Sequence, residues 1–143
     1  MKISDVLRSK GGGVVTIKPD DTVEHLLALL DEHRIGAIVV STDGAAVEGI
    51  VSERDIVRHL HGTGTSVLEG PVTAIMTSEV TTGSANDNIA DLAGTMTEMR
   101  VRHVPIVDED GTLTAIVSIG DIVKHRLSEL QSERDALRDY ITN

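Results

Sequence analysis

Hydrophobic positions follow the same order of patterns in each half of the chain. Short β-branched runs predict strands, and apolar residues spaced three and four apart predict amphipathic helices. The predicted elements of the first half are a strand at 14–17, a helix opening at Asp21-Thr22 and ending at Gly36, strands at 37–40 and 47–51 around Asp43-Gly44, and a helix at 52–60. This order reads as strand, helix, strand, strand, helix.

The second half repeats the first. A shift of 66 positions lays residues 14–60 on residues 80–126 without a gap, and thirteen positions are identical. The repeat predicts a helix with apolar positions from Ile89 to Met96, a turn at Asp110-Gly111 and a last helix from Ser118 onward. Two copies are too few for a solenoid, so we expect a pseudo-symmetric pair sharing one core.

Segments outside the aligned repeats complete the picture. Similar short segments, 3–7 and 72–76, precede the two copies. The stretch 61–70 is rich in Gly, Thr and Ser and predicts a flexible connection. We therefore divide the chain into a first repeat at 1–63, a linker with the second repeat at 64–127, and a C-terminal extension at 128–143.

Each half has a strand that runs into a Ser-x-x-Asp motif, Ser52 to Asp55 and Ser118 to Asp121. One interpretation is a helix capping box, in which the serine and the aspartate satisfy backbone amides. The alternative is a nucleotide site, because a carboxylate can accept both ribose hydroxyls while the helix N-terminus favours phosphate. The motif by itself leaves both interpretations open.

The whole pattern resembles the cystathionine beta-synthase (CBS) domain family. The two Ser-x-x-Asp-Ile-Val motifs, the segment Arg102 to Val107 and the lead-in Ile75-Met76-Thr77 carry the resemblance, which extends to about Leu127. It implies an α+β fold, in which a tandem pair of β-α-β-β-α repeats packs sheet to sheet with pseudo-two-fold symmetry. It also implies a regulatory module that binds adenosine-containing ligands such as AMP, ADP or ATP in two clefts.

The resemblance implies a role for particular residues in each cleft. Asp55 and Asp121 resemble ribose-binding aspartates, and Ser52 and Ser118 resemble phosphate-side hydroxyls. The other candidate ligand-binding residues are Thr16, Ile17, Lys18, Gly36, Ala37, Ile38 and Arg54 in the first half, and Thr82, Arg102, His103, Val104, Pro105 and Ile116 in the second, with Ile50 as the counterpart of Ile116.

The two halves differ in their cations. The second copy has Arg102-His103 where the first has Gly36-Ala37, and the first has Arg54 where the second has Gly120. Arginine suits phosphate because its guanidinium group binds bidentately. Since the Asp121 cleft keeps more of the family pattern, we expect it to be the better occupied of the two.

Composition excludes several classes of protein. The 143-residue chain has no Cys, so thiolate metal sites, cysteine nucleophiles and disulfides are ruled out. With 13 Lys+Arg against 23 Asp+Glu, a net charge of -10 and Tyr140 as its one aromatic residue, the chain is a poor general binder of nucleic acid. It has neither an apolar signal segment nor a membrane-length run, so we expect a cytoplasmic protein away from membranes.

The six histidines form no recognisable catalytic or metal-binding motif. We therefore expect no enzyme activity, no metal and no required cofactor. The leading hypothesis is an adenine-nucleotide sensor of energy state that acts on an unknown effector protein. The alternatives are a structural pair with vestigial sites, a sensor of NAD(H) or S-adenosylmethionine, and a small nucleotide-acting enzyme.

Apolar positions spaced three, four and seven apart continue past the second repeat, from Ile122 to Ile141. This spacing predicts one amphipathic helix with a charged outer face. The helix either caps its own domain or also contributes to a homodimer, which the family resemblance implies.

Overall fold

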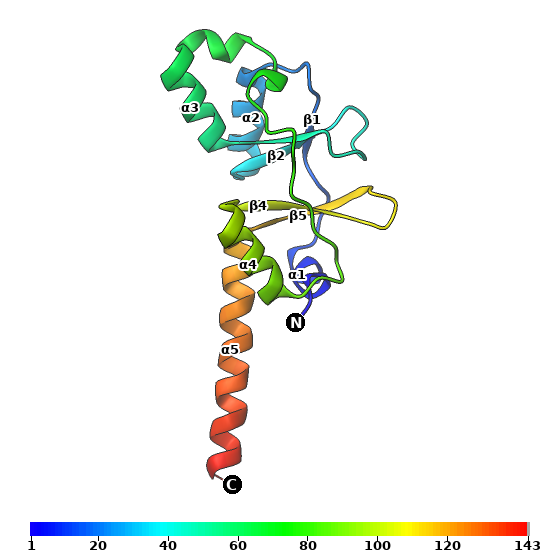
Figure 1. The fold of residues 1–143 in the computed structure, drawn as a ribbon, viewed down its shortest axis with the longest axis vertical. Helices are drawn as coiled ribbons and strands as arrows, with labels where there is room; N and C mark the ends of the chain where they lie inside the picture. Colours follow the sequence, from blue (N-terminus) through cyan, green and yellow to red (C-terminus); the bar gives the residue numbers. More distant parts are fainter. Residues whose placement is uncertain (143) are drawn as a thin grey trace.

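The computed structural model describes residues 1–142, and Asn143, the last residue of the predicted C-terminal helix, lies outside this range. Two similar halves are stacked with their sheets facing one another and their helices outside (Figure 1). The first half contains β1 (Thr16–Ile17), α2 (Val23–His33), β2 (Ala37–Val40), β3 (Gly49–Ser52) and α3 (Glu53–Thr63). The second half contains α4 (Ile89–Met99), β4 (His103–Val107), β5 (Leu113–Ser118) and α5 (Ile119–Thr142). The predicted tandem α+β fold is confirmed.

Three further segments connect or precede the halves. Helix α1 (Ile3–Lys10) leads into the first half, and two 3-10 helices, η1 (Thr65–Glu69) and η2 (Val72–Ala74), join the halves. The stretch 61–70 is therefore not the flexible connection that its composition predicts. Val67 and Leu68 pack against the first core, and the burial of these side chains orders the segment.

The two sheets share one topology. In the first sheet, β1 pairs parallel to β2, and β2 pairs antiparallel to β3. In the second, β4 pairs antiparallel to β5, and the strand that would match β1 is reduced to one parallel bridge between Gly83 and Ile106. This bridge lies 66 positions after the pair Ile17 and Val40, so both sheets keep the register that the sequence repeat predicts.

The first helix ends earlier than predicted. Helix α2 stops at His33 rather than at Gly36, and Arg34 takes a left-handed backbone conformation with φ 54°. The Ile35 amide donates to the Leu30 carbonyl at 3.1 Å, which folds the Ile35 side chain back onto the first core. The apolar contact of this capping motif compensates for a conformation that glycine would adopt more easily.

The structure has two hydrophobic cores instead of the one shared core expected from the repeat, and each contains a segment from the other half. The first core is built around Leu26, Ile38 and Val51, and it also contains Val72 and Ile75, which precede the second repeat. The second core contains Ile3 and Val6 of α1, which precede the first repeat. The two lead-in segments are thus exchanged, and neither core is complete without the other repeat.

Backbone hydrogen bonds fix this exchange in the same way on both sides. The Val72 amide donates to the Asp21 carbonyl at 2.8 Å, and the Ile3 amide donates to the Asp87 carbonyl at 2.9 Å. Asp21 and Asp87 are equivalent positions of the two repeats. The division of the chain at residue 63 stays a prediction, and the packing crosses it in both directions.

Helix α5 extends well beyond the body of the molecule (Figure 1). Its apolar residues Leu127, Leu130, Leu137 and Ile141 are exposed, the last to 80%. No helix within residues 1–142 has both the length and the apolar character needed to span a membrane.

The exchange predicts that Ile3 stabilises the second half although it precedes the first. Ile3 is fully buried, so we expect Ile3→Ala to lower the free energy of unfolding by about 2–5 kcal/mol, the cost of a large-to-small change in a core. Met99→Ala is the control, because Met99 is 58% exposed. Urea denaturation measures both, and a loss for Ile3→Ala no larger than that of the control would contradict the exchange.

Candidate functional site

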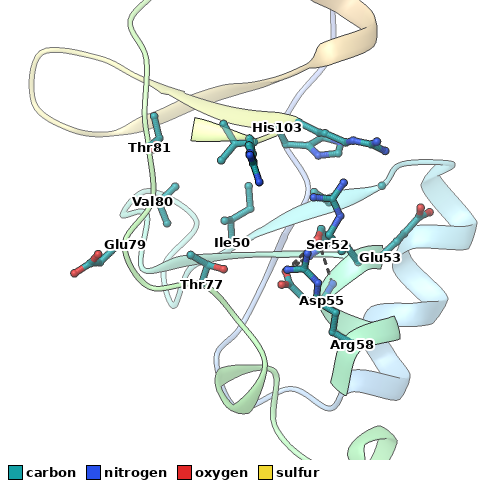
Figure 2. Close-up of a pocket in the computed structure, with 16 residues that line it drawn as sticks. Ile50, Ser52, Glu53, Asp55, Arg58, Thr77, Glu79, Val80, Thr81 and His103 are labelled. Carbon is teal, nitrogen blue, oxygen red and sulfur yellow. Dashed lines mark hydrogen bonds between the residues drawn. The ribbon is translucent and has the colours of Figure 1, made fainter. Parts of the chain in front are cut away.

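A cleft of about 250 Å³ opens between the two halves at the start of α3 (Figure 2). Its walls come from β2, β3 and α3 of the first half, the connection 77–81, and the junction of α4 with β4. The lining residues are Gly36, Ala37, Ile50, Ser52, Glu53, Arg54, Asp55, Arg58, Thr77, Glu79, Val80, Thr81, Arg100, Val101, Arg102 and His103.

The connection 76–81 forms one wall because it crosses β3 at a glycine. Ile50 and Thr77 exchange two backbone hydrogen bonds of 2.9 Å. A Cβ atom on Gly49 would lie 2.6 Å from the Met76 Sδ atom and 3.0 Å from the Thr77 carbonyl oxygen. Only glycine therefore lets the connection approach this closely and bring Thr77, Val80 and Thr81 to the cleft.

The Ser-x-x-Asp motif at the start of α3 forms a capping box and also lines the cleft. The Asp55 Oδ2 atom accepts from the Ser52 amide at 2.9 Å and from the Ser52 hydroxyl at 3.1 Å, while the Ser52 Oγ atom accepts from the Asp55 amide. Within residues 1–142, Asp55 Oδ1 has no hydrogen-bond partner. The capping interpretation is thus correct for one carboxylate oxygen, and the other oxygen is free for a ligand.

The equivalent motif in the second half is closed by a lysine. Asp121 and Ser118 form the same box, and the Lys10 Nζ atom donates to Asp121 Oδ2 at 2.6 Å and to the Ile116 carbonyl at 2.8 Å. Burial opposes ionisation of Asp121, but the hydrogen bonds from Lys10 and from the Ser118 amide outweigh it and hold the pKa of Asp121 below its ordinary value. The chain itself therefore supplies a cationic partner for the Asp121 carboxylate.

The lead-in segments explain why only one of the two aspartates is paired. Residues 3–10 match residues 72–79 with a shift of 69, so the counterpart of Lys10 is Glu79, which lines the open cleft. A carboxylate cannot pair with Asp55, whereas the ammonium group of Lys10 pairs with Asp121. This charge reversal is one difference between the two sites.

His103 of β4 lies across the cleft from Gly36, and a Cβ atom on Gly36 would lie 3.4 Å from the His103 Cε1 atom. Burial lowers the pKa of His103, the positive charge of Lys10 lowers it further, and Glu53 and Asp121 act in the opposite direction. The imidazole is therefore neutral at neutral pH and can both donate and accept a hydrogen bond.

Some of the predicted site residues line the cleft and the others do not. Gly36, Ala37, Ser52, Arg54, Asp55, Arg102 and His103 line the cleft together with Ile50. The predicted residues Ile17, Ile38, Val104 and Pro105 are buried in the sheets, and Thr16, Lys18, Thr82, Ile116, Ser118 and Asp121 do not line this cleft. The family resemblance predicted that the cleft at Asp121 is the better occupied of the two, whereas the cleft in the structure lies at Asp55.

Sequence reasoning missed eight lining residues, namely Glu53, Arg58, Thr77, Glu79, Val80, Thr81, Arg100 and Val101. The repeat could have indicated two of them, because Arg100 and Val80 are identical to their repeat partners Arg34 and Val14. Within residues 1–142 no group of three or more His, Asp or Glu side chains is placed to hold a metal ion.

The fold and the cleft define a tandem pair of repeats with a polar site between them, and the comparisons with known proteins agree. The family model of the CBS domain matches residues 3–62 and 72–128, so the chain belongs to the CBS-domain family. The CBS domain-containing protein CBSX3, mitochondrial, of Arabidopsis thaliana is 35% identical over 97% of this chain and 71% of its own length.

Two solved structures show the same fold. The CBS-domain containing protein ATU1752 of Agrobacterium tumefaciens is 41% identical with a TM-score of 0.83, covering 88% of this chain and 99% of its own. The CBS domain protein PAE2072 of Pyrobaculum aerophilum, complexed with AMP, is 28% identical with a TM-score of 0.75, covering 85% of this chain and 89% of its own.

The Lys10 contact predicts a measurable change at Asp121. In Lys10→Met the ammonium group is lost, so we expect the pKa of Asp121 to rise toward or above its ordinary value. Because a depressed carboxyl pKa adds stability that is lost as the pH falls, the variant should lose less stability on acidification than the wild type. NMR titration of the Asp121 side-chain carboxyl carbon measures this pKa in wild type and variant.

Lys18→Met is the matched control, because Lys18 is exposed and lies outside the cleft. An Asp121 pKa that is the same in wild type and Lys10→Met would show that the contact is absent in solution.

Proposed function

We propose that the chain is a regulatory module without catalytic activity that binds an adenine nucleotide in the cleft at Asp55. Bound nucleotide would report the energy state of the cell to an effector protein. The observation that carries the proposal is the cleft between the repeats, in which the Asp55 carboxylate lies beside the N-terminus of α3.

The cleft has an apolar part and a charged part, as a nucleotide requires. In the view of Figure 2, Ile50 and Val80 lie toward one side, and Ser52, Asp55 and Arg58 lie toward the other. An adenine ring would pack between aliphatic side chains, since the chain has no aromatic residue there. Asp55 would accept the ribose hydroxyls, and the N-terminus of α3 would face phosphate.

A relative supports this assignment. PAE2072, at 28% identity, is a CBS-domain protein complexed with AMP. The chemistry of the cleft here fits the same class of ligand, because it combines a ribose acceptor with guanidinium groups that bind phosphate. S-adenosylmethionine and NAD(H) remain alternative ligands of the adenosine class, and the cytoplasmic location stays a prediction.

For Asp121 alone, we favour a structural role over ligand binding. Lys10 forms an ion pair with Asp121 Oδ2, the oxygen that also accepts the capping bond, so a ligand at Asp121 would have to compete with this ion pair. We therefore expect one nucleotide per chain instead of two.

Titration calorimetry with AMP and ATP tests the proposal on wild type, Asp55→Asn and Asp121→Asn. Asparagine can keep the capping bond, but it loses the charge-assisted bonds to ribose that are worth about 1.5–3 kcal/mol. We expect affinity to fall tenfold to a hundredfold in Asp55→Asn and to change little in Asp121→Asn. Both aspartates have the same capping role, so Asp121→Asn controls for loss of the cap.

Two outcomes would contradict the proposal. Binding of neither nucleotide by the wild type would favour a purely structural module. A larger loss of affinity in Asp121→Asn than in Asp55→Asn would move the site to the second half.

We also infer that the protein forms a homodimer through the outer faces of its helices. Val57 of α3 and Val123 of α5 are equivalent positions, and they are 65% and 49% exposed. Leu27, Ile56 and Leu60 line a groove between α2 and α3 beside Val57. Pairing of two copies would bury these apolar side chains.

Sedimentation velocity of the wild type and of the double variant Val57→Glu, Val123→Glu checks the dimer. We expect a dimer for the wild type and a monomer for the variant, since a buried unpaired charge is costly. Truncation after Leu127 shows whether the α5 extension adds to the contact. A monomeric wild type at tens of micromolar would refute the dimer.

A further inference from the structure

Four arginines line the cleft, and they come from both halves of the molecule. Arg54 and Arg58 lie on α3, whereas Arg100 and Arg102 lie where α4 turns into β4. None of the four forms a salt bridge with another residue in the range 1–142. Two segments from opposite halves thus each bring two arginines to the cleft, and none of these arginines has a carboxylate partner within residues 1–142.

The charge of this cleft is opposite to that of the whole chain. Its lining has four arginines and the three carboxylates Glu53, Asp55 and Glu79, which gives 4 − 3 = +1, while the chain carries -10. Like charges placed together repel one another unless an anion lies between them. The arrangement thus favours an anionic ligand over a neutral or cationic one.

The repeat shows that these arginines are not required by the fold. At the equivalent positions, 66 residues away, Arg54 is replaced by Gly120 and Arg102 by Gly36. The other two counterparts are Lys124 and Arg34. Two of the four positions lack a cation in the other copy, where Lys10 adds one, so the fold does not require Arg54 and Arg102.

Arg100 occupies a position where a side chain is costly. Its φ is 56°, and Arg34 is the other non-glycine residue with positive φ among residues 1–142. This conformation costs about 1–2 kcal/mol for a residue that has a Cβ atom. Arg34, in the same turn of the first repeat, lies on the groove between α2 and α3, so it provides a control outside the cleft.

We propose that the cleft selects adenosine carrying a chain of two or three phosphates over adenosine carrying one. A terminal monophosphate is satisfied by one or two bidentate guanidinium groups, whereas four groups on two facing walls match a longer polyphosphate. Arg54 and Arg58 are four residues apart and share one face of α3, opposite Arg100 and Arg102. This inference rests on the proposed function, because it assumes that Asp55 holds the ribose.

The inference is tested by calorimetry at fixed ionic strength with adenosine, AMP, ADP, ATP and S-adenosylmethionine. For the wild type we expect ATP and ADP to bind at least tenfold more tightly than AMP, and adenosine and S-adenosylmethionine to bind more weakly than AMP. The affinity for ATP should also fall more steeply with salt than the affinity for AMP.

Variants assign the selectivity to the arginines. We expect Arg54→Gln with Arg102→Gln to lower ATP affinity tenfold to a hundredfold and to change adenosine affinity less than threefold. Arg100→Gln should show the same selective loss, and Arg34→Gln, at the matching left-handed turn, should change neither affinity.

The results separate this inference from the proposed function. Equal affinities for AMP and ATP, or an equal loss of all ligands in the arginine variants, would overturn the polyphosphate preference and leave nucleotide binding intact. Absence of binding by every adenosine compound would overturn both. Tight binding of inorganic tripolyphosphate with no gain from adenosine would also overturn the inference, because the cleft would then select the anion alone.

Discussion

The exchange of lead-in segments between the two cores is the constraint on which the rest of the structure depends. Val72 and Ile75 complete the first core, and Ile3 and Val6 complete the second. Because the chain must then return from the first core to the second repeat, residues 76–81 cross β3 at Gly49. The cleft wall formed by this connection is therefore a consequence of how the cores are completed.

The same exchange makes the two sites unequal. Lys10, at the end of the first lead-in, contacts the Ser-x-x-Asp box at Asp121, whereas its counterpart Glu79 lines the cleft on the side away from Asp55 (Figure 2). Lys10 forms an ion pair with Asp121, whereas Asp55 has no ion pair within residues 1–142. The charge of one residue in each lead-in thus contributes to the difference between two pseudo-symmetric sites.

Much of the fold follows from the sequence, because the repeat shows each element twice. The boundaries of β2 and the starts of α3 and α5 agree with the pattern. The end of α2 does not, since burial of Ile35 and not a glycine decides where the helix stops. The open cleft could not be predicted locally, because Lys10 reaches Asp121 across 111 positions and the shift that aligns the lead-ins differs from that of the repeats.

Charge in the open cleft is coupled to the closed site through His103. Lys10, Asp121 and Glu53 all act on the His103 imidazole, and burial keeps its pKa below the ordinary value. An anionic ligand in the cleft would stabilise the protonated ring, so binding would raise this pKa and take up a proton. By linkage, lower pH would favour the anion as long as the ligand itself stays ionised. His103 would therefore respond to an anion in the cleft as well as to the Lys10–Asp121 ion pair.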